Sequence, residues 1–128
     1  MRIARFVRPT WAYVAPADSL HSAAARMRTS GLTALPVVAD GAVVALITER
    51  DLVRAMAISD RPRAARVADY MRNGSVTVGY DDDASAALLK MLAIGCLDLP
   101  VIRGSTLIGM VSARELLAAQ AQVHGVAV

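Results

Sequence analysis

The sequence predicts a mixed α/β (α+β) fold of two tandem β-α-β-β-α repeats that pack together with pseudo-twofold symmetry. The first observation is the repeat itself: moving the sequence by 64 positions places Met1–Ala64 over Ala65–Val128 with fifteen identical pairs. The second is that both copies show the same order of strand and helix patterns. The third is size, because one such unit is too small to enclose a core alone. We therefore expect residues 1–64 and 65–128 to form two repeats of one module.

Each expected element of the first copy has a local signal. Ser19 is a favourable helix N-cap, and Gly31 suits the end of the helix that follows it. Asp40-Gly41 is a strong signal for a two-residue hairpin turn. The expected elements are a strand at 12–14, a helix at 20–30, strands at 35–39 and 42–47, and a helix from 48 to about 58.

The second copy repeats this order after a joint at 60–63 and a short helical piece at 64–71. Gly95 ends its first helix, and Gly104-Ser105 makes its hairpin turn. In both copies the strands lack clean alternation, so we expect sheets that are covered on both faces. The expected elements are a strand at 76–78, a helix at 84–94, strands at 99–102 and 106–111, and a helix from about 113 to 122.

Composition indicates an aliphatic core and a cytoplasmic protein. Hydrophobic residues make up 55% of the chain and aromatic residues only 4%, and this apolar excess suggests that some apolar side chains lie at a subunit interface. The lone Cys96 excludes an internal disulfide and indicates a reducing compartment. No signal peptide is visible, and polar residues interrupt the longest apolar stretch, so we expect no membrane span.

The sequence offers no constellation for catalysis or metal binding, and we expect neither an enzyme nor a required cofactor. His21 and His124 stand without cysteines or carboxylates at metal-ligand spacing. The chain has no glycine-rich phosphate loop. Cys96 lies in an apolar context without a cue for a catalytic base, which favours an inert core residue.

A four-residue motif begins twelve residues after the proline of each Leu-Pro-Val run: Thr48-Glu49-Arg50-Asp51 and Ser112-Ala113-Arg114-Glu115. Its structural interpretation is a capping box, in which the Thr or Ser and the acid three residues later satisfy free backbone amides at a helix start. Glu is the preferred acid of such a box, so the second motif fits this interpretation even better. A ligand-binding role is compatible with capping.

The repeated order of motifs resembles the CBS-domain pair, often called a Bateman module. Each copy begins with Val7 or Met71 and has a helix that ends in Met-x-x-x-Gly. The run Leu-Pro-Val and an apolar strand that enters the Thr/Ser-x-Arg-acid motif then follow. The resemblance covers essentially the whole chain. It implies two clefts between the repeats that bind adenosine-containing ligands such as AMP, ADP, ATP or S-adenosylmethionine and thereby regulate a partner protein. It also implies a homodimer, here expected to be a stand-alone pair.

The resemblance further implies which residues contact a ligand. Asp51 would accept hydrogen bonds from the ribose diol, Thr48 and the helix start would face phosphate, and Leu35-Pro36 would form a wall for adenine. Arg50 and Arg114 are candidates for phosphate contact or, equally, solvated arginines. Val7, Pro9 and Thr10 begin the copy where the family contacts ligand. The candidate residues are Thr33, Ala34, Leu35, Pro36, Thr48, Arg50 and Asp51 in the first copy, and Leu99, Pro100, Ser112, Arg114 and Glu115 in the second.

The two clefts are not expected to be equal. Glu115 is one methylene longer than the aspartate that the family pattern prefers, and Asp98 would repel phosphates where the equivalent Ala34 is neutral. We therefore expect the first-copy cleft to be the better adenosine site, with the second empty or selective for a less anionic ligand.

Two other functions remain open from the sequence. The first is a ligand-free dimeric interaction module, which the departures at Glu115 and Asp98 favour. Its contacts would come from the helix faces at 52–56 and 116–121. The second is nucleic-acid binding, for which a solvated basic face is the competing explanation. Its candidate residues are Arg2, Arg5, Arg8, Arg61, Arg63 and Arg66.

Overall fold

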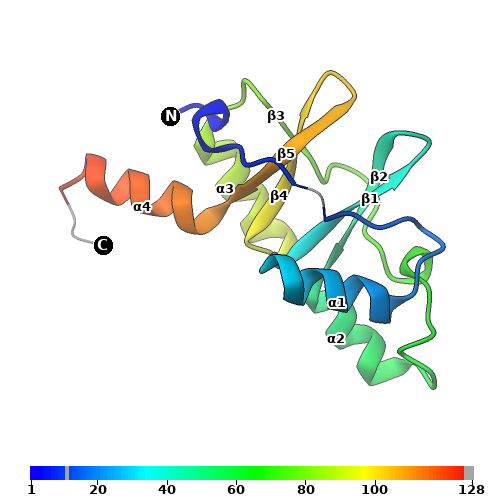
Figure 1. The fold of residues 1–128 in the computed structure, drawn as a ribbon. Coiled ribbons are helices and arrows are strands. Elements are labelled where there is room, and N and C mark those ends of the chain that lie inside the picture. Colours follow the sequence, from blue (N-terminus) through cyan, green and yellow to red (C-terminus); the bar gives the residue numbers. More distant parts are fainter. Residues whose placement is uncertain (11, 126–128) are drawn as a thin grey trace.

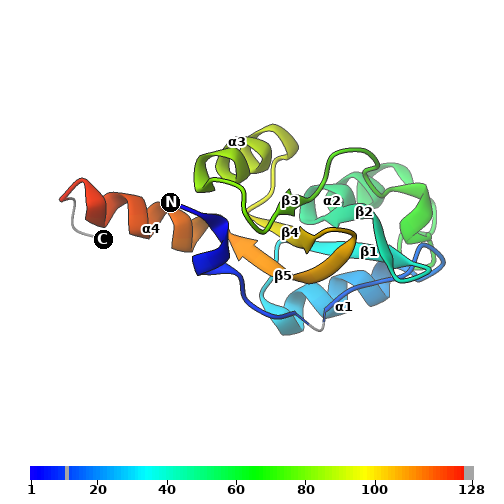
Figure 2. The same cartoon turned by 90° about the horizontal axis from the view of Figure 1, so that it is seen from above.

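The computed structural model describes residues 1–10 and 12–125, so the last three residues of the predicted second repeat lie outside it. Two hairpins form the centre, and helices flank them (Figure 1). Helices α1 and α2 lie beside the first hairpin, while α4 projects at the opposite end of the molecule (Figure 2). The first copy contains α1 (Leu20–Ser30), β1 (Ala34–Ala39), β2 (Ala42–Thr48) and α2 (Glu49–Ile58). The second contains β3 (Val78–Gly79), α3 (Ala84–Ile94), β4 (Asp98–Arg103), β5 (Thr106–Ser112) and α4 (Ala113–Val123).

The local signals in the sequence act as expected in the first copy. The Ser19 side chain accepts a hydrogen bond from the Ser22 amide and caps α1, which ends at Gly31 in a left-handed conformation. Asp40 and Gly41 have φ values of 51° and 77°, as a type I′ turn between paired antiparallel strands requires. The mixed α+β fold class is confirmed.

The sheets are smaller than predicted. β1 and β2 form a two-stranded sheet, and β3, β4 and β5 form a three-stranded one. The strand expected at 12–14 is reduced to a single parallel bridge between Val14 and Val37, because Pro16 follows closely and lacks an amide to extend the ladder. The equivalent β3 pairs with β4 over only two residues, Val78 and Gly79.

The first residues of each repeat lie on the other repeat. The Ile3 amide donates to the Asp82 carbonyl at 2.9 Å, and at the equivalent position the Val67 amide donates to the Asp18 carbonyl at 2.8 Å. These residues lie in two short 3₁₀ helices, η1 (Ile3–Phe6) and η2 (Val67–Asp69). Farther along, Arg8 pairs with Met110 of β5, and Arg72 pairs with Leu46 of β2. The pseudo-symmetric exchange of the two segments fastens the copies together.

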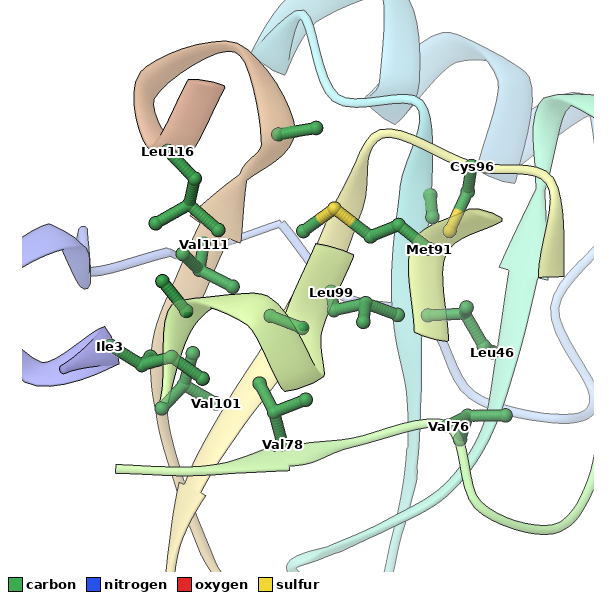
Figure 3. Packing of buried hydrophobic residues seen from close by; sticks show 14 residues of the cluster. Ile3, Leu46, Val76, Val78, Met91, Cys96, Leu99, Val101, Val111 and Leu116 are labelled. Carbon is green, nitrogen blue, oxygen red and sulfur yellow. The ribbon is translucent and has the colours of Figure 1, made fainter. Parts of the chain in front are cut away.

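The core consists of two clusters of buried aliphatic side chains. One is centred on Val14, Leu35 and Ile47 of the first copy and includes Val67 of the second. The other includes Leu99, Val101 and Leu116 but also Leu46 of β2, so it extends across the boundary between the copies (Figure 3). Packing across this boundary removes apolar surface that neither repeat could bury alone. In the described part of the chain, no helix has the length and apolarity needed to cross a membrane.

Acid should weaken the junction between the N-terminal segment and α3. Hydrogen bonds from Ser85 and from the Met1 ammonium group lower the pKa of Asp83 well below its ordinary value of 3.8. The carboxyl group has an ordinary pKa in the unfolded chain, so its stabilisation is complete above about pH 4 and declines as the pH falls further. We expect Asp83→Asn, which can still cap α3, to flatten this decline in urea-unfolding free energies measured from about pH 5 to pH 2. An unchanged pH dependence in the variant would contradict the assignment.

Candidate functional site

A cleft of about 780 Å³ opens between the two copies. We call it the Glu115 cleft. Three parts of the chain form its walls. They are the exchanged N-terminal segment, one face of α1, and the start of β4 together with the end of β5 and the first turn of α4. Its lining comprises Arg8, Pro9, Thr10, Ala12, Ser22, Ala25, Arg26, Thr29, Ser30, Leu32, Asp98, Met110, Val111, Ser112 and Glu115. The volume suits a ligand the size of a nucleoside or nucleotide.

Glu115 is accessible at the wall of this cleft. Its side chain is 33% exposed, and its Oε1 forms an ion pair with Nε of Arg8 at 2.7 Å. The capping box predicted at this motif is wrong, because Ser112 makes no side-chain cap hydrogen bond. The longer glutamate side chain instead reaches across to the exchanged segment of the other copy, and its carboxylate stays available from the cleft.

Asp51, at the equivalent position in the first copy, is buried and fully engaged. Its Oδ2 accepts hydrogen bonds from the amide and hydroxyl of Thr48, both at 2.9 Å, which completes the predicted capping box of α2. Its Oδ1 accepts a hydrogen bond from Nε of Arg72 at 3.2 Å, and Arg54 lies 3.7 Å away. Asp51 and Thr48 are both 0% exposed. The carboxylate therefore holds the second copy's exchanged segment rather than facing a cavity.

Apolar side chains occupy the region of the first copy that corresponds to the Glu115 cleft. Val76, Leu46 and Cys96 stand where the cleft has Ala12, Met110 and Leu32, and they pack in one cluster (Figure 3). Ala34 replaces Asp98, and Ile94 replaces Ser30 against the same cluster. Lys90, the equivalent of Arg26, donates hydrogen bonds to the Ser75 hydroxyl and the Thr77 carbonyl. The geometry therefore favours the cleft of the second motif over that of the first.

Asp98 lines the Glu115 cleft and is only 6% exposed. Its Oδ2 accepts hydrogen bonds from the Thr33 amide at 2.8 Å and the Thr33 hydroxyl at 2.7 Å. The Thr33 hydroxyl in turn accepts a hydrogen bond from the Leu97 amide. Thr33 therefore ties the first copy to the start of β4 and fixes the orientation of the Asp98 carboxylate.

The predicted ligand-contacting residues divide into three groups. Ser112 and Glu115 line the cleft, as do Pro9 and Thr10 of the exchanged segment. Arg50 and Arg114 are exposed but are not part of the lining, and the Arg50 guanidinium lies over Gly95 at the end of α3. The others are buried or half-buried and are not part of the lining: Thr33, Ala34, Leu35, Pro36, Thr48, Asp51, Leu99 and Pro100.

Sequence reasoning missed the face of α1 and the role of Arg8. Ser22, Arg26 and Thr29 recur at helical spacing and line the cleft, whereas the equivalent face of α3 carries Ala86, Lys90 and Ala93. A comparison of these two helix faces, made position by position across the repeat, would have indicated which cleft is polar and open.

The other reactive groups of the described residues form no second site. Burial raises the pKa of the Cys96 thiol, which donates a weak hydrogen bond to the Asp98 carbonyl at 3.3 Å. A buried thiol with a raised pKa is a poor nucleophile. Within residues 1–10 and 12–125, no three His, Cys, Asp or Glu side chains gather closely enough to hold a metal ion.

Comparisons with known proteins agree with this architecture. An uncharacterized 17.7 kDa protein of Acidianus ambivalens is 36% identical over 113 residues, which are 87% of this chain and 68% of that protein. The crystal structure of a signal-transduction protein with CBS domains from Burkholderia ambifaria is 27% identical, with a TM-score of 0.77, and the match covers 88% of this chain and 84% of that one.

A third protein shows the same fold at lower identity. It comes from Methanocaldococcus jannaschii and is described as a proposed archaeal homolog of g-AMPK. Its TM-score is 0.80 at 21% identity, and the match covers 94% of this chain and 48% of that one. The sequence model of the CBS domain matches this chain twice, at residues 3–58 and 67–122. The chain therefore belongs to the CBS domain family and carries a pair of these domains.

Proposed function

We propose that this CBS domain pair is a regulatory module that binds an adenosine-containing ligand, such as AMP, ADP, ATP or S-adenosylmethionine, in the Glu115 cleft. The observation that carries the proposal is the open cleft between the copies, with Ser112 and Glu115 of the repeated motif in its wall. The archaeal homolog of g-AMPK shares this fold. The proposal assigns binding to the chain and no catalytic step.

The chemistry of the cleft suits a nucleoside. The Glu115 carboxylate can accept two charge-assisted hydrogen bonds from a ribose diol, each worth about 1.5–3 kcal/mol. Ala12, Ala25, Leu32 and Met110 provide apolar surface for a flat base, and hydroxyl groups on α1 provide donors and acceptors. Arg8 is 75% exposed, so it can turn toward solvent when the diol takes its place on Glu115.

Ligand binding would be communicated through the exchanged segment. Arg8 belongs to the first copy and pairs with Glu115 of the second, and both line the cleft. A diol that competes for Glu115 alters this contact between copies and so shifts the packing of η1 against β5. We propose that a partner protein reads this shift, because a ligand changes a conformational equilibrium only when it contacts the two states differently.

Calorimetric titration of the purified protein with AMP, ATP and S-adenosylmethionine tests the proposal. Glu115→Ala should weaken binding of whichever ligand binds by about 10- to 100-fold, because the diol loses its acceptor. Arg114→Ala is the matched control, since Arg114 is the neighbouring exposed residue and is not part of the cleft lining. This variant should bind the ligand with wild-type affinity. Absence of binding by all three compounds, or equal affinity in Glu115→Ala, would overturn the proposal.

A second function, a ligand-free dimeric interaction module, is favoured by exposed apolar side chains on the helices. Val53 and Met56 of α2 are 68% and 67% exposed, and Leu92 of α3 is 80% exposed. Such side chains suit the helix-to-helix contact of a homodimer. Sedimentation of wild-type protein and Met56→Glu with and without nucleotide distinguishes the two functions. Two results together would favour this second function. The wild-type protein would be an obligate dimer that Met56→Glu disrupts, and it would bind a partner equally with and without nucleotide.

A further inference from the structure

The charged groups that line the Glu115 cleft are not equally available to a ligand. Two arginines and two carboxylates line it, so their formal charges cancel. Arg8 and Glu115 pair with each other, and the Arg26 guanidinium donates a hydrogen bond to the Tyr13 carbonyl. A highly anionic ligand therefore finds no excess of positive charge in this cleft.

Asp98 differs from these three groups. Among residues 1–10 and 12–125, hydrogen bonds to its carboxylate reach only Oδ2, and both come from Thr33. No fully buried side-chain oxygen or nitrogen of the described residues lacks a partner. The second oxygen, Oδ1, accepts no hydrogen bond from residues 1–10 and 12–125, and Asp98 lines the cleft although it is 94% buried as a whole. A carboxylate oxygen in such a position requires a hydrogen-bond donor, from water or from a ligand.

We propose that Asp98 is a specificity-determining residue that contacts the 5′ substituent of the bound adenosine ligand and selects a cationic substituent over a phosphate. The inference rests on the proposed function, since it assumes that the ribose binds at Glu115. With the ribose there, the proposal places the 5′ substituent toward Asp98, which lines the same cleft as Glu115. A cation is attracted to the free oxygen, and a phosphate is repelled by it in the low-dielectric interior of the cleft. Adenosine compounds with a 5′ ammonium or sulfonium group fit this requirement.

Three compounds that differ only in the 5′ substituent test the selection: 5′-amino-5′-deoxyadenosine, adenosine and AMP, which are cationic, neutral and anionic. In calorimetric titrations, wild-type protein should bind the amino compound at least about tenfold more tightly than AMP. Asp98→Asn can keep its side-chain oxygen on Thr33 and turn its amide NH₂ group toward the cleft. The variant should lower the ratio of the two affinities by about tenfold or more.

Thr33→Val is the matched control for a structural effect. It removes the hydroxyl that supports Asp98, but the amide of residue 33 still donates to Oδ2 and holds the carboxylate at the cleft. The variant should therefore lower the melting temperature and preserve the order of affinities. The wild-type series decides the question even if Asp98→Asn fails to fold.

Each alternative outcome contradicts the selection. AMP binding as tightly as the amino compound to wild type would overturn it, as would an unchanged ratio in Asp98→Asn. An equal loss of affinity for all three compounds in Asp98→Asn would indicate that Asp98 contacts the base or the ribose, and this too would overturn the selection. These results leave the proposed function standing. If none of the compounds binds wild-type protein or Asp98→Asn, the proposed function fails together with the inference.

Discussion

Asp51→Ala should destabilise the protein far more than Glu115→Ala, although the two residues occupy equivalent positions in the repeat. Asp51 is 0% exposed, and its loss leaves Thr48 and Arg72 without their partner. Arg72 is itself 35% exposed. We therefore expect a loss of about 3 kcal/mol, at the low end for breaking a buried ion pair. This corresponds to a fall of about 10 °C in melting temperature. Urea unfolding followed by circular dichroism gives the free energy.

Glu115→Ala is the matched comparison for this prediction. The Glu115–Arg8 pair is largely exposed, so its removal should change the unfolding free energy by only about 0–1 kcal/mol. Ligand affinity should show the opposite order: Glu115→Ala should remove most of it, and Asp51→Ala should affect it less. Equal destabilisation by the two substitutions would contradict the assignment of a structural role to Asp51 and a binding role to Glu115.

Gly109→Ala should both destabilise the fold and deform the Glu115 cleft. A Cβ atom on Gly109 would overlap the backbone carbonyl of Arg8, which cannot rotate away as a side chain could. The overlap would push the Arg8 segment away from β5 and lengthen the two backbone hydrogen bonds between Arg8 and Met110, which are 2.9 and 2.8 Å long. We expect a loss of about 1–3 kcal/mol in unfolding free energy, typical of overpacking. Since Arg8, Pro9 and Thr10 would move with the segment, ligand affinity measured by calorimetry should fall as well.

Ala45→Gly is the control for Gly109→Ala, because Ala45 is the equivalent residue of the first copy. It is buried on β2, away from the lining of the Glu115 cleft. The substitution should cost stability of roughly 1 kcal/mol through the added backbone freedom and the lost methyl group. It should leave ligand affinity unchanged. A parallel fall in affinity in both variants would show that binding follows overall stability rather than the position of the Arg8 segment.

The helices and hairpins could be predicted closely from the sequence because their signals are local. Ser19 and Gly31 mark the two ends of α1, and Gly95 marks the end of α3; the predicted bounds of both 11-residue helices are confirmed. Asp40-Gly41 marks the turn of the first hairpin. Helix caps and two-residue turns depend on residues that are close in the sequence, so a single sequence is enough to predict them.

The exchange of the N-terminal segments and the open cleft could not be predicted in the same way. The pairing of Arg8 with Met110 joins residues 102 positions apart (110 − 8), and no local pattern specifies it. Which of the two acids is buried depends on the side-chain lengths of Asp51 and Glu115. It also depends on whether an arginine of the other copy contacts the carboxylate. The sequence comparison ranked the Asp51 cleft first because aspartate suits a diol, but the same short side chain also closes the capping box on Thr48.

The most direct test of the account is a crystal structure of the protein grown with the adenosine compound that binds most tightly in calorimetry. We expect one ligand per chain, in the cleft between α1 and β5, with its ribose diol on Glu115 and its 5′ substituent facing Asp98. Asp51 should remain buried on Thr48 and Arg72. A ligand bound at Asp51, or in both clefts with equal occupancy, would contradict the central claim that the two repeats have divided structural support and ligand binding between them.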